Sequence, residues 1–464
     1  MWHSGLLAKL KACGISENLL QWFKNYLENR RQRVVLPGTM SNWAPINAGV
    51  PQGSILGPLL FLVYINDIVA NIQSNIRLFA DDTSLYLIVD HAHQTAEIIQ
   101  SDIIKITDWA KSWLVTFNPS KTESLLISRK KNKPHHPTLN ILDTQIEDVT
   151  SHKHLGVYLS NDGNWHSHIE YIRDKAWKRI SVMRKMKFVL DRKSLEIIYL
   201  SFIRPLLEYS DVVWNNCTVA EKQELESIQH EAARICIGAT KFISINNLMK
   251  EICWESLEER RRQHKLILFY KMSNNLVPSY LTSMIPPCVG LASRYNLRNS
   301  DDFQVIHSRT KIYSESFLPS AVREWNSLPT EVRNSGTVQS FRSAIKNKTG
   351  SQIPNYYFFG KRKGQILHTR LRTNCSTLKL TLFQKNLIES PLCECGEIES
   401  ADHYLLICPL FQQLRMALFD TIRPFCTPSS KVLLCGDSSF DFQTNIFIFQ
   451  AVQNFIIQSK RFPS

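Results

Sequence analysis

Residues 76–87 read Ile-Arg-Leu-Phe-Ala-Asp-Asp-Thr-Ser-Leu-Tyr-Leu, and this stretch decides the fold of the first part of the chain. Two β-type runs, 76–80 and 83–87, flank Asp81 and Asp82, which predicts a hairpin with two carboxylates at its tip. Adjacent carboxylates repel each other, and a divalent cation such as Mg²⁺ removes that cost. Taken alone, the four residues 79–82 favour a solvated turn, since Asp is common in turns.

A glycine-rich loop precedes the hairpin. Residues 49–58 read Gly-Val-Pro-Gln-Gly-Ser-Ile-Leu-Gly-Pro and lead into the apolar run 59–65. Its three glycines and two prolines let the backbone approach a flat ligand closely, and Gln52 offers an amide to a base or to a backbone. We expect a helix to begin near Pro58 and to carry residues 59–68. An ordinary loop-to-helix connection is the alternative, but the two carboxylates that follow favour a binding loop.

Helical periodicity organises much of the remaining chain. Ser16 is positioned to cap a helix, the segment 32–36 is β-type, and Pro37-Gly38 breaks it. Apolar residues at helical spacing predict helices around 99–113, 169–183 and 225–235, with Gly238 as the C-terminal cap of the last one. The helix over 169–183 is strongly basic and includes Lys178 and Arg179. From 240 to 350 no clean periodicity persists.

Composition narrows the class of protein. The 464 residues suit two to four domains, and 44% hydrophobic content excludes a disordered chain. Lys plus Arg total 55 against 41 Asp plus Glu, so the formal charge is 55 − 41 = +14, which points to a polyanionic partner. Charge alone does not separate nucleic acid from an acidic membrane surface. The apolar run 59–65 is far shorter than the roughly 20 residues of a membrane span, and no signal peptide is visible.

A cysteine cluster lies near the C-terminal end. The chain has an odd number of cysteines, 11, mostly scattered, which fits a reducing compartment. Cys393, Cys395, His403 and Cys408 form a C-x-C-x₇-H-x₄-C arrangement of the ligand types that structural Zn²⁺ prefers, and Gly396 permits the sharp turn that it needs. In the functional interpretation, these four residues form a zinc knuckle that binds nucleic acid. Four reduced groups in a metal-free fold are the alternative. Other cysteines, such as Cys236 and Cys253, are expected to pack as small apolar residues.

Four ordered motifs resemble those of a known family. Residues 49–58, then Phe79–Asp82, then 117–122 (Phe-Asn-Pro-Ser-Lys-Thr), then 154–157 (His-Leu-Gly-Val) are similar to successive motifs of reverse transcriptases of non-LTR retrotransposons, the LINE-type lineage of the Jockey or CR1 kind. Residues 295–298, 317–326 and the cysteine cluster also resemble the C-terminal half of that lineage.

The resemblance implies an α+β fold: a right-hand polymerase palm, N-terminally incomplete, with a helical thumb and an α-rich C-terminal region containing a zinc-knuckle-like motif. We expect a partial palm over 1–160, a thumb over 161–240, a connector over 241–350 and the C-terminal region over 351–464. The implied activity is RNA-directed DNA polymerisation by a two-Mg²⁺ mechanism, with an RNA template, a DNA primer or target, and dNTPs as partners and no membrane.

The resemblance also assigns roles to single residues. Asp81 and Asp82 would bind Mg²⁺, and Lys121 would lie near the triphosphate as proton donor, with an exposed strand-edge lysine as the alternative. The positions expected to contact substrate or nucleic acid are Pro51, Gln52, Gly53, Leu155, Gly156, Lys178 and Arg179. Leu155-Gly156 would belong to the primer-grip hairpin. For the basic helix, a solvated helix face is the alternative.

One departure from the family pattern affects the expected activity. The family has a third carboxylate in a motif resembling Phe-Asp-x-Val-x-His-x-x-Leu-Leu, and residues 1–7 match only its tail. We therefore expect a truncated chain that lacks this aspartate, the fingers and an endonuclease, and is inactive by itself. A catalytically dead nucleic-acid-binding remnant and a gene-model fragment are the rival interpretations. A nuclear and cytoplasmic ribonucleoprotein is the location that the resemblance implies.

Overall fold

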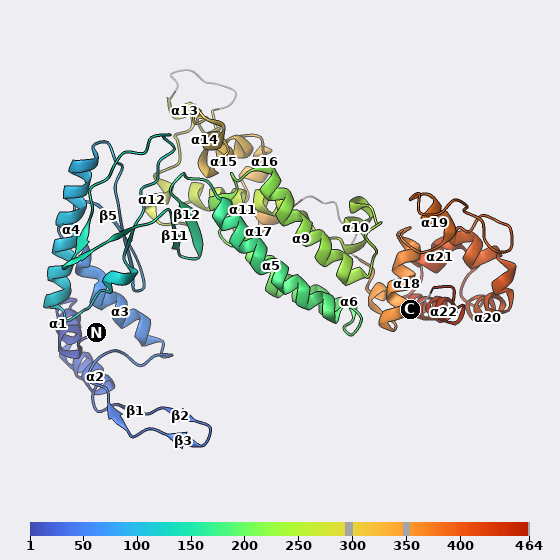
Figure 1. Ribbon diagram of the computed structural model, residues 1–464, viewed down its shortest axis with the longest axis horizontal. Coiled ribbons are helices and arrows are strands. Elements are labelled where there is room, and N and C mark those ends of the chain that lie inside the picture. The colour runs from blue at the N-terminus through green and yellow to red at the C-terminus, as the bar shows by residue number, and fades with distance from the viewer. Residues whose placement is uncertain (293–299, 347–352, 463–464) are drawn as a thin grey trace. The chain divides into compact units, whose positions relative to one another are not determined.

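The computed structural model describes residues 1–292, 300–346 and 353–462 (Figure 1). The chain divides into two compact units, Met1–Asn164 and Trp165–Ser464. The first unit combines helices with six two-stranded sheets, and the named elements of the second unit are all helical within the described residues. This segregation agrees with the α+β class expected from the sequence.

The first unit contains all the named strands. Its helices are α1 (His3–Ala12), α2 (Glu17–Leu27), α3 (Leu56–Ile65), η1 (Asn66–Val69), α4 (Ala92–Ser112) and η2 (Pro119–Lys121). Its strands are β1 (Arg31–Gln32), β2 (Val35–Leu36), β3 (Thr39–Met40), β4 (Ala44–Pro45), β5 (Asn75–Phe79), β6 (Asp82–Tyr86), β7 (Glu123–Ser124), β8 (Asn140–Ile141), β9 (Thr144–Gln145), β10 (Glu147–Asp148), β11 (Ser151–His154) and β12 (Val157–Ser160). The sheets pair β1 with β4, β2 with β3, β5 with β6, β7 with β10, β8 with β9 and β11 with β12.

Of the three apolar clusters in the first unit, one packs α4 against the β8–β9 hairpin, and the other two involve the elements that carry or adjoin predicted site residues. Buried side chains of α1, α2 and α3 form one of them, which includes Leu6, Leu27 and Leu60. The other lies between α4 and the β5–β6 hairpin, where Ile106 contacts the inward residues of the strands, among them Leu78. Alternate residues of β5 therefore face the core, and the polar positions between them face solvent, as a half-buried hairpin requires.

The helices of the second unit follow without a strand between them. They are α5 (His166–Met186), α6 (Arg192–Ile198), η3 (Tyr199–Ile203), α7 (Arg204–Glu208), α8 (Asp211–Trp214), α9 (Val219–Ile237), α10 (Ile245–Ile252), α11 (Leu257–Ser273), α12 (Ser279–Thr282), α13 (Val289–Ala292), α14 (Lys311–Ser314), α15 (Phe317–Asn326), α16 (Thr330–Arg333), α17 (Val338–Ile345), η4 (Asn355–Phe358), α18 (Arg362–Arg372), α19 (Lys379–Phe383), η5 (His403–Ile407), η6 (Pro409–Phe411), α20 (Gln412–Ile422), α21 (Ser430–Cys435) and α22 (Phe442–Gln458).

The long helices α5 and α9 lie side by side (Figure 1). The apolar residues that predicted both helices are the ones they bury, including Ile169 and Ile180 on α5 and Leu225 on α9. Thr218 and Glu221 form a capping box at the start of α9, and Gly238 ends it at φ +70°, as the sequence predicted. Trp165 and Trp177 are partly buried and pack against this same core.

Among its described residues, the segment without visible periodicity contains helices α10 to α17, which the sequence pattern did not reveal. Helix α11 buries Arg261, Gln263 and Lys265 beside its apolar residues, and these polar positions hide the apolar repeat. Two of them have polar partners: the Lys265 ammonium pairs with Glu324, and the Gln263 amide donates to Glu255 at 2.9 Å. The Nε and Nη1 of Arg261 have no hydrogen-bond partner among the described residues. The stretch 295–298, which carried part of the family resemblance, lies outside the described residues.

Smaller differences concern single boundaries. Helix α3 begins at Leu56 rather than near Pro58, and a 3₁₀ turn replaces its expected last turn after Ile65. Cys236 is buried, as expected, but Cys253 is exposed at the C-terminal cap of α10, where its φ is +53°. Among the described residues, no helix has both the length and the apolar content needed to cross a membrane.

Candidate functional site

The two carboxylates lie at the turn of the β5–β6 hairpin. Phe79 pairs with Asp82, so Ala80 and Asp81 are the two loop residues, and Ala80 adopts φ +50°. Asp81 and Asp82 are both exposed. Within the part of the chain that the structure describes, neither carboxylate has an ion-pair or hydrogen-bond partner. The hairpin therefore presents two free sets of oxygen donors, the ligand type that Mg²⁺ prefers.

A buried aspartate on α4 fixes the base of this hairpin. The carboxylate of Asp102 is fully buried and accepts hydrogen bonds from the backbone N–H groups of Gln73, at 3.0 Å, and Ser74, at 2.7 Å. Lys105 supplies the counter-charge at 2.9 Å. Burial alone would raise the pKa of Asp102, but these hydrogen bonds lower it below its ordinary value. Sequence analysis missed this residue, since one Asp on an amphipathic helix carries no signal of its own.

The glycine-rich loop is held against α3 and α1. The Ser54 hydroxyl donates to the Pro51 carbonyl at 2.8 Å and accepts from the N–H of Gly57 at 3.0 Å. A Cβ on Gly57 would lie 3.1 Å from the Pro51 oxygen, so this position needs glycine for the close approach. Gly53 has φ +82° and meets no atom within 4 Å, so its glycine serves the turn. Gln52 and Gly53 are exposed, which leaves this loop open to a ligand.

A buried lysine anchors the same helices. Lys9 on α1 donates to the Tyr64 carbonyl and to the Asp67 carboxylate, both at 2.5 Å, and its ammonium lies 3.7 Å from the centre of the Trp113 ring. Burial lowers the pKa of Lys9, although Asp67 opposes that shift. Aromatic faces and one carboxylate stabilise a cation that would otherwise be costly to bury.

The remaining residues predicted for the first unit lie in two turns. Lys121 is exposed at the end of the 3₁₀ turn η2, where the Asn118 side chain accepts from the N–H of Ser120 at 3.1 Å. Leu155 and Gly156 form the two-residue turn of the β11–β12 hairpin, with φ of +46° and +86°. Positive φ at both positions is typical of a type I′ turn, which explains the glycine.

The basic helix α5 uses part of its charge internally. Arg173 pairs with Glu170, Asp174 and Glu224, and Arg179 donates to the Phe202 carbonyl. Lys178 is exposed and has no partner among the described residues. Of the two α5 residues predicted to contact nucleic acid, Lys178 is therefore free to do so, whereas Arg179 already has an intramolecular acceptor.

The cysteine cluster is a compact four-ligand centre. The ligand atoms of Cys393, Cys395, His403 and Cys408 all lie within 4.8 Å of one another. The Sγ–Sγ distances from Cys408 are 3.8 Å to Cys393 and 3.9 Å to Cys395, and the Nε2 of His403 lies 3.2 Å from the Sγ of Cys395. A tetrahedral zinc with Zn–S bonds of about 2.3 Å separates its sulfurs by about 3.8 Å. The donor set therefore fits Zn²⁺ in both chemistry and spacing.

Local structure explains how the four ligands converge. The carbonyl of Cys393 accepts from the N–H of Gly396 at 3.0 Å, and Gly396 adopts φ +93°, which confirms the predicted turn. His403 and Cys408 come from the two ends of the helical turn η5, where the Cys408 N–H donates to the His403 carbonyl at 2.7 Å. Burial raises the pKa of the Cys408 thiol to about 12.

An ion pair ties this centre to the end of the chain. Glu399, which lies between Cys395 and His403 in the sequence, is buried and accepts two hydrogen bonds of 2.6 Å from Arg461. Burial would raise the pKa of Glu399, but Arg461 and the N–H of Lys379 hold it below its ordinary value. Bidentate pairing of this kind is the strong form of a charge-assisted hydrogen bond.

Comparison with known proteins identifies the class. Residues 1–171 match the family described as reverse transcriptase (RNA-dependent DNA polymerase). The fold is accordingly of the palm-and-thumb polymerase type, and the chain resembles an RNA-directed DNA polymerase.

Individual relatives narrow the lineage. The chain is 26% identical over 274 residues to a probable RNA-directed DNA polymerase from transposon X-element of Drosophila melanogaster, covering 57% of this chain and 30% of that protein. It is 26% identical over 265 residues to the RNA-directed DNA polymerase from mobile element jockey of the same species, covering 54% of this chain and 28% of that protein. It is 20% identical over 384 residues to a retrovirus-related Pol polyprotein from type-1 retrotransposable element R1 2 of Nasonia vitripennis, covering 79% and 86%. The resemblance to LINE-type reverse transcriptases is thus confirmed.

Proposed function

We propose that this chain supplies part of an RNA-directed DNA polymerase of a non-LTR retrotransposon, with Asp81 and Asp82 as Mg²⁺ ligands. The observation that carries the proposal is the β5–β6 hairpin, inside the segment that matches the reverse transcriptase family. Its turn presents two carboxylates that have no partner among the described residues. Asp81 and Asp82 would hold Mg²⁺, which would supply the positive charge needed to activate a primer 3′-hydroxyl and to stabilise a leaving pyrophosphate. RNA template, DNA primer and dNTPs are the partners under this proposal, in a nuclear and cytoplasmic ribonucleoprotein.

The residues of the chain would position the reactants. Asp102 would keep the carboxylate tip in place by holding the start of β5. The exposed loop at Pro51, Gln52 and Gly53 would contact the base pair being formed, and the Leu155-Gly156 turn would support the primer end. Lys121 would contact the triphosphate from an exposed 3₁₀ turn. Lys178 would contact a backbone phosphate from α5. The four-part division into palm, thumb, connector and C-terminal region, with boundaries near 160, 240 and 350, belongs to the same proposal.

The two carboxylates can be tested without an activity assay. Mn²⁺ substitutes for Mg²⁺ at oxygen sites and is followed by electron paramagnetic resonance. We expect Asp81→Asn with Asp82→Asn to abolish the tightest Mn²⁺ binding. Asp143→Asn is a matched control, because Asp143 follows a positive-φ leucine in the two-residue turn of another hairpin, β8–β9. Equal Mn²⁺ binding by the wild type and the double variant would refute the assignment.

Activity is a separate question from metal binding. The family pattern calls for a third carboxylate that the 464 residues do not contain, so we propose that they do not extend a primer by themselves. Primer extension on an RNA template measures this directly. Product that disappears in the Asp81→Asn variant would overturn the proposed inactivity while supporting the proposed polymerase site.

We also propose that the cluster of Cys393, Cys395, His403 and Cys408 binds one structural Zn²⁺. Its sulfur spacing and its three thiol and one imidazole donors support this. Bound zinc would hold the turn at Gly396 and the helical turn η5 together.

The second candidate function is binding of nucleic acid without catalysis. The exposed Lys178 and the metal-type cluster favour it, because neither requires the carboxylate hairpin. Binding of an RNA–DNA hybrid that survives in the double Asp81 and Asp82 variant, together with no primer extension by the wild type, would favour this candidate over the enzyme.

A further inference from the structure

A basic pocket lies where the C-terminal ends of α5 and α9 meet α18. Its cavity volume is about 170 Å³, and apolar side chains such as Phe188 and Ile366 form part of its wall. Ligand pockets for drug-sized molecules start near about 300 Å³, so this one suits a smaller group. Its charged lining consists of a single carboxylate, Glu231, and six cations: Arg184, Lys187, Arg234, Lys241, Arg362 and Arg370.

The internal contacts leave this positive charge largely uncompensated. Arg184 pairs with Glu231 at 2.9 Å, and Arg234 lies 3.5 Å from the same carboxylate. The Nε of Arg234 is buried and has no hydrogen-bond partner in the structure. Within the described residues, no carboxylate lies within ion-pair distance of Lys187 or Lys241. The wall thus has one carboxylate and six cations, of which Arg362 also interacts with Asp191 outside the pocket lining. This excess of positive charge is the composition of an anion site.

Two of the arginines donate hydrogen bonds to carbonyls at helix C-termini beside the pocket. Arg362 donates to the carbonyls of Lys187, Ile235 and Cys236 at 2.7–2.8 Å, and Arg370 donates to the Gly238 carbonyl at 2.8 Å. These carbonyls belong to helix C-termini, which carry partial negative charge that would otherwise repel an anion. The guanidinium groups neutralise it. Burial lowers the pKa of both arginines because it destabilises their charged forms. A bound anion would stabilise those charged forms.

We propose that this pocket binds a phosphate group, and that its occupant is a backbone phosphate of nucleic acid. The choice of nucleic acid over free phosphate rests on the proposed function, whereas the anion site rests on the pocket alone. Lys187 and Lys241 supply positive charge that no carboxylate within the described residues pairs with, and Arg234 adds a further cation to the wall. The pocket contains residues from both the α5–α9 pair and α18, so a bound backbone would contact the C-terminal helices as well as the thumb-type helices.

The first arm of the test uses inorganic phosphate. We expect phosphate to raise the thermal midpoint of the full chain, and to do so much less in the double variant Lys187→Gln with Lys241→Gln. The double variant Lys311→Gln with Lys385→Gln removes the same charge at exposed positions outside the pocket and is the matched control. A phosphate effect equal in all three proteins would overturn the anion site. Circular dichroism establishes that each variant is folded.

The second arm uses a short fluorescein-labelled RNA–DNA hybrid, followed by anisotropy across roughly 50–200 mM salt. We expect the pocket variant to bind roughly tenfold more weakly and its salt slope to fall by about one per lysine removed. Phosphate stabilisation with unchanged hybrid binding would overturn the nucleic-acid occupant and leave a free-phosphate site. Failure of this arm is distinguishable from failure of the proposed polymerase site, which is measured by Mn²⁺ binding at Asp81 and Asp82.

Discussion

The buried carboxylate of Asp102 accepts a hydrogen bond of 2.7 Å from the backbone N–H of Ser74. This bond links α4 to Ser74, the residue just before β5, which is the strand that leads into the Asp81–Asp82 turn. An exposed turn with free carboxylates has little packing of its own, so its position depends on the anchored base of the hairpin.

Replacing Asp102 with Asn should loosen that base. An amide presents one acceptor oxygen where the carboxylate uses both, and it loses the charge that pairs with Lys105. We expect a loss of about 1–3 kcal/mol in the free energy of unfolding and faster hydrogen exchange at the amides of Gln73 and Ser74. Asp108→Asn is the control on the same helix, since Asp108 is 65% exposed. Unchanged exchange at both amides in Asp102→Asn would contradict the anchoring role.

The cysteine cluster should contain zinc in the purified protein. We expect about one equivalent by elemental analysis, because four ligands close a structural site. Cys408→Ser should lose the metal and lower the thermal midpoint, and a chelator should have the same effect on the wild type. Cys426→Ser, which changes a cysteine outside the cluster, should keep both the zinc and the midpoint. A metal-free wild type of unchanged stability would rule out the zinc site.

Gly238→Ala should destabilise the second unit for two reasons. Gly238 has φ +70°, and a Cβ there would lie 2.4 Å from the Cγ1 of Ile366 on α18. Gly14→Ala isolates the backbone cost, because Gly14 has φ +83° with nothing within 4 Å. We expect Gly14→Ala to cost about 1 kcal/mol and Gly238→Ala about 1–3 kcal/mol more, measured by urea unfolding. Equal losses of stability in the two variants would mean that α18 shifts to make room for the Cβ at position 238 without destabilising the protein.

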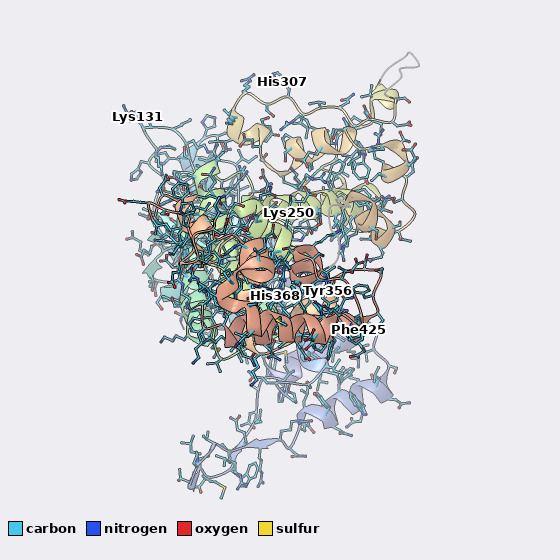
Figure 2. The ribbon with its side chains drawn as sticks, turned by 90° about the vertical axis from the view of Figure 1, so that its right-hand side faces the viewer. Lys131, Lys250, His307, Tyr356, His368 and Phe425 are labelled. Atoms are coloured by element: carbon cyan, nitrogen blue, oxygen red, sulfur yellow. The ribbon has the colours of Figure 1, made fainter. Side chains whose placement is uncertain are left out.

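Acid should destabilise the second unit through its buried histidines. His368 lies among the C-terminal helices near Tyr356 in Figure 2, and its Nε2 is 2.9 Å from the Leu433 carbonyl. Burial lowers its pKa to about 3, and that of His168 to about 4. When burial lowers the pKa of a histidine in the folded state, protonation of that histidine favours unfolding. Its stabilising contribution is therefore complete above about pH 6.5 and is lost as the pH falls toward the folded pKa.

The His368→Gln variant tests this dependence. We expect the free energy of unfolding to fall less steeply between about pH 6.5 and pH 5 than in the wild type, by up to about 1.4 kcal/mol per pH unit. Some dependence should remain because His168 is unchanged. Urea titrations at several pH values measure how the free energy of unfolding changes with pH. Identical slopes in both proteins would show that His368 does not cause this pH dependence.

Local patterns determined much of the fold. The apolar repeats of α4, α5 and α9, the cap at Gly238 and the hairpin around Asp81 and Asp82 are each specified by residues near one another in the chain, so they were predictable. Helix α11 was not, because its buried Lys265 pairs with Glu324 and its buried Arg261 lies over the Trp214 ring, both far away in sequence. No window of local sequence contains those partners.

The same distinction between local sequence and distant partners applies to the candidate sites. The sequence by itself determined the chemistry: two adjacent carboxylates, a glycine-rich loop and a Cys-Cys-His-Cys set. The tertiary structure alone decided which charges are available. Arg362 and Arg372 of the basic stretch 361–372 have internal partners, helix carbonyls and Glu251, rather than free positions at the surface. Whether a cation is free depends on which acceptors folding brings within hydrogen-bond reach, and those acceptors come from residues more than a hundred positions away.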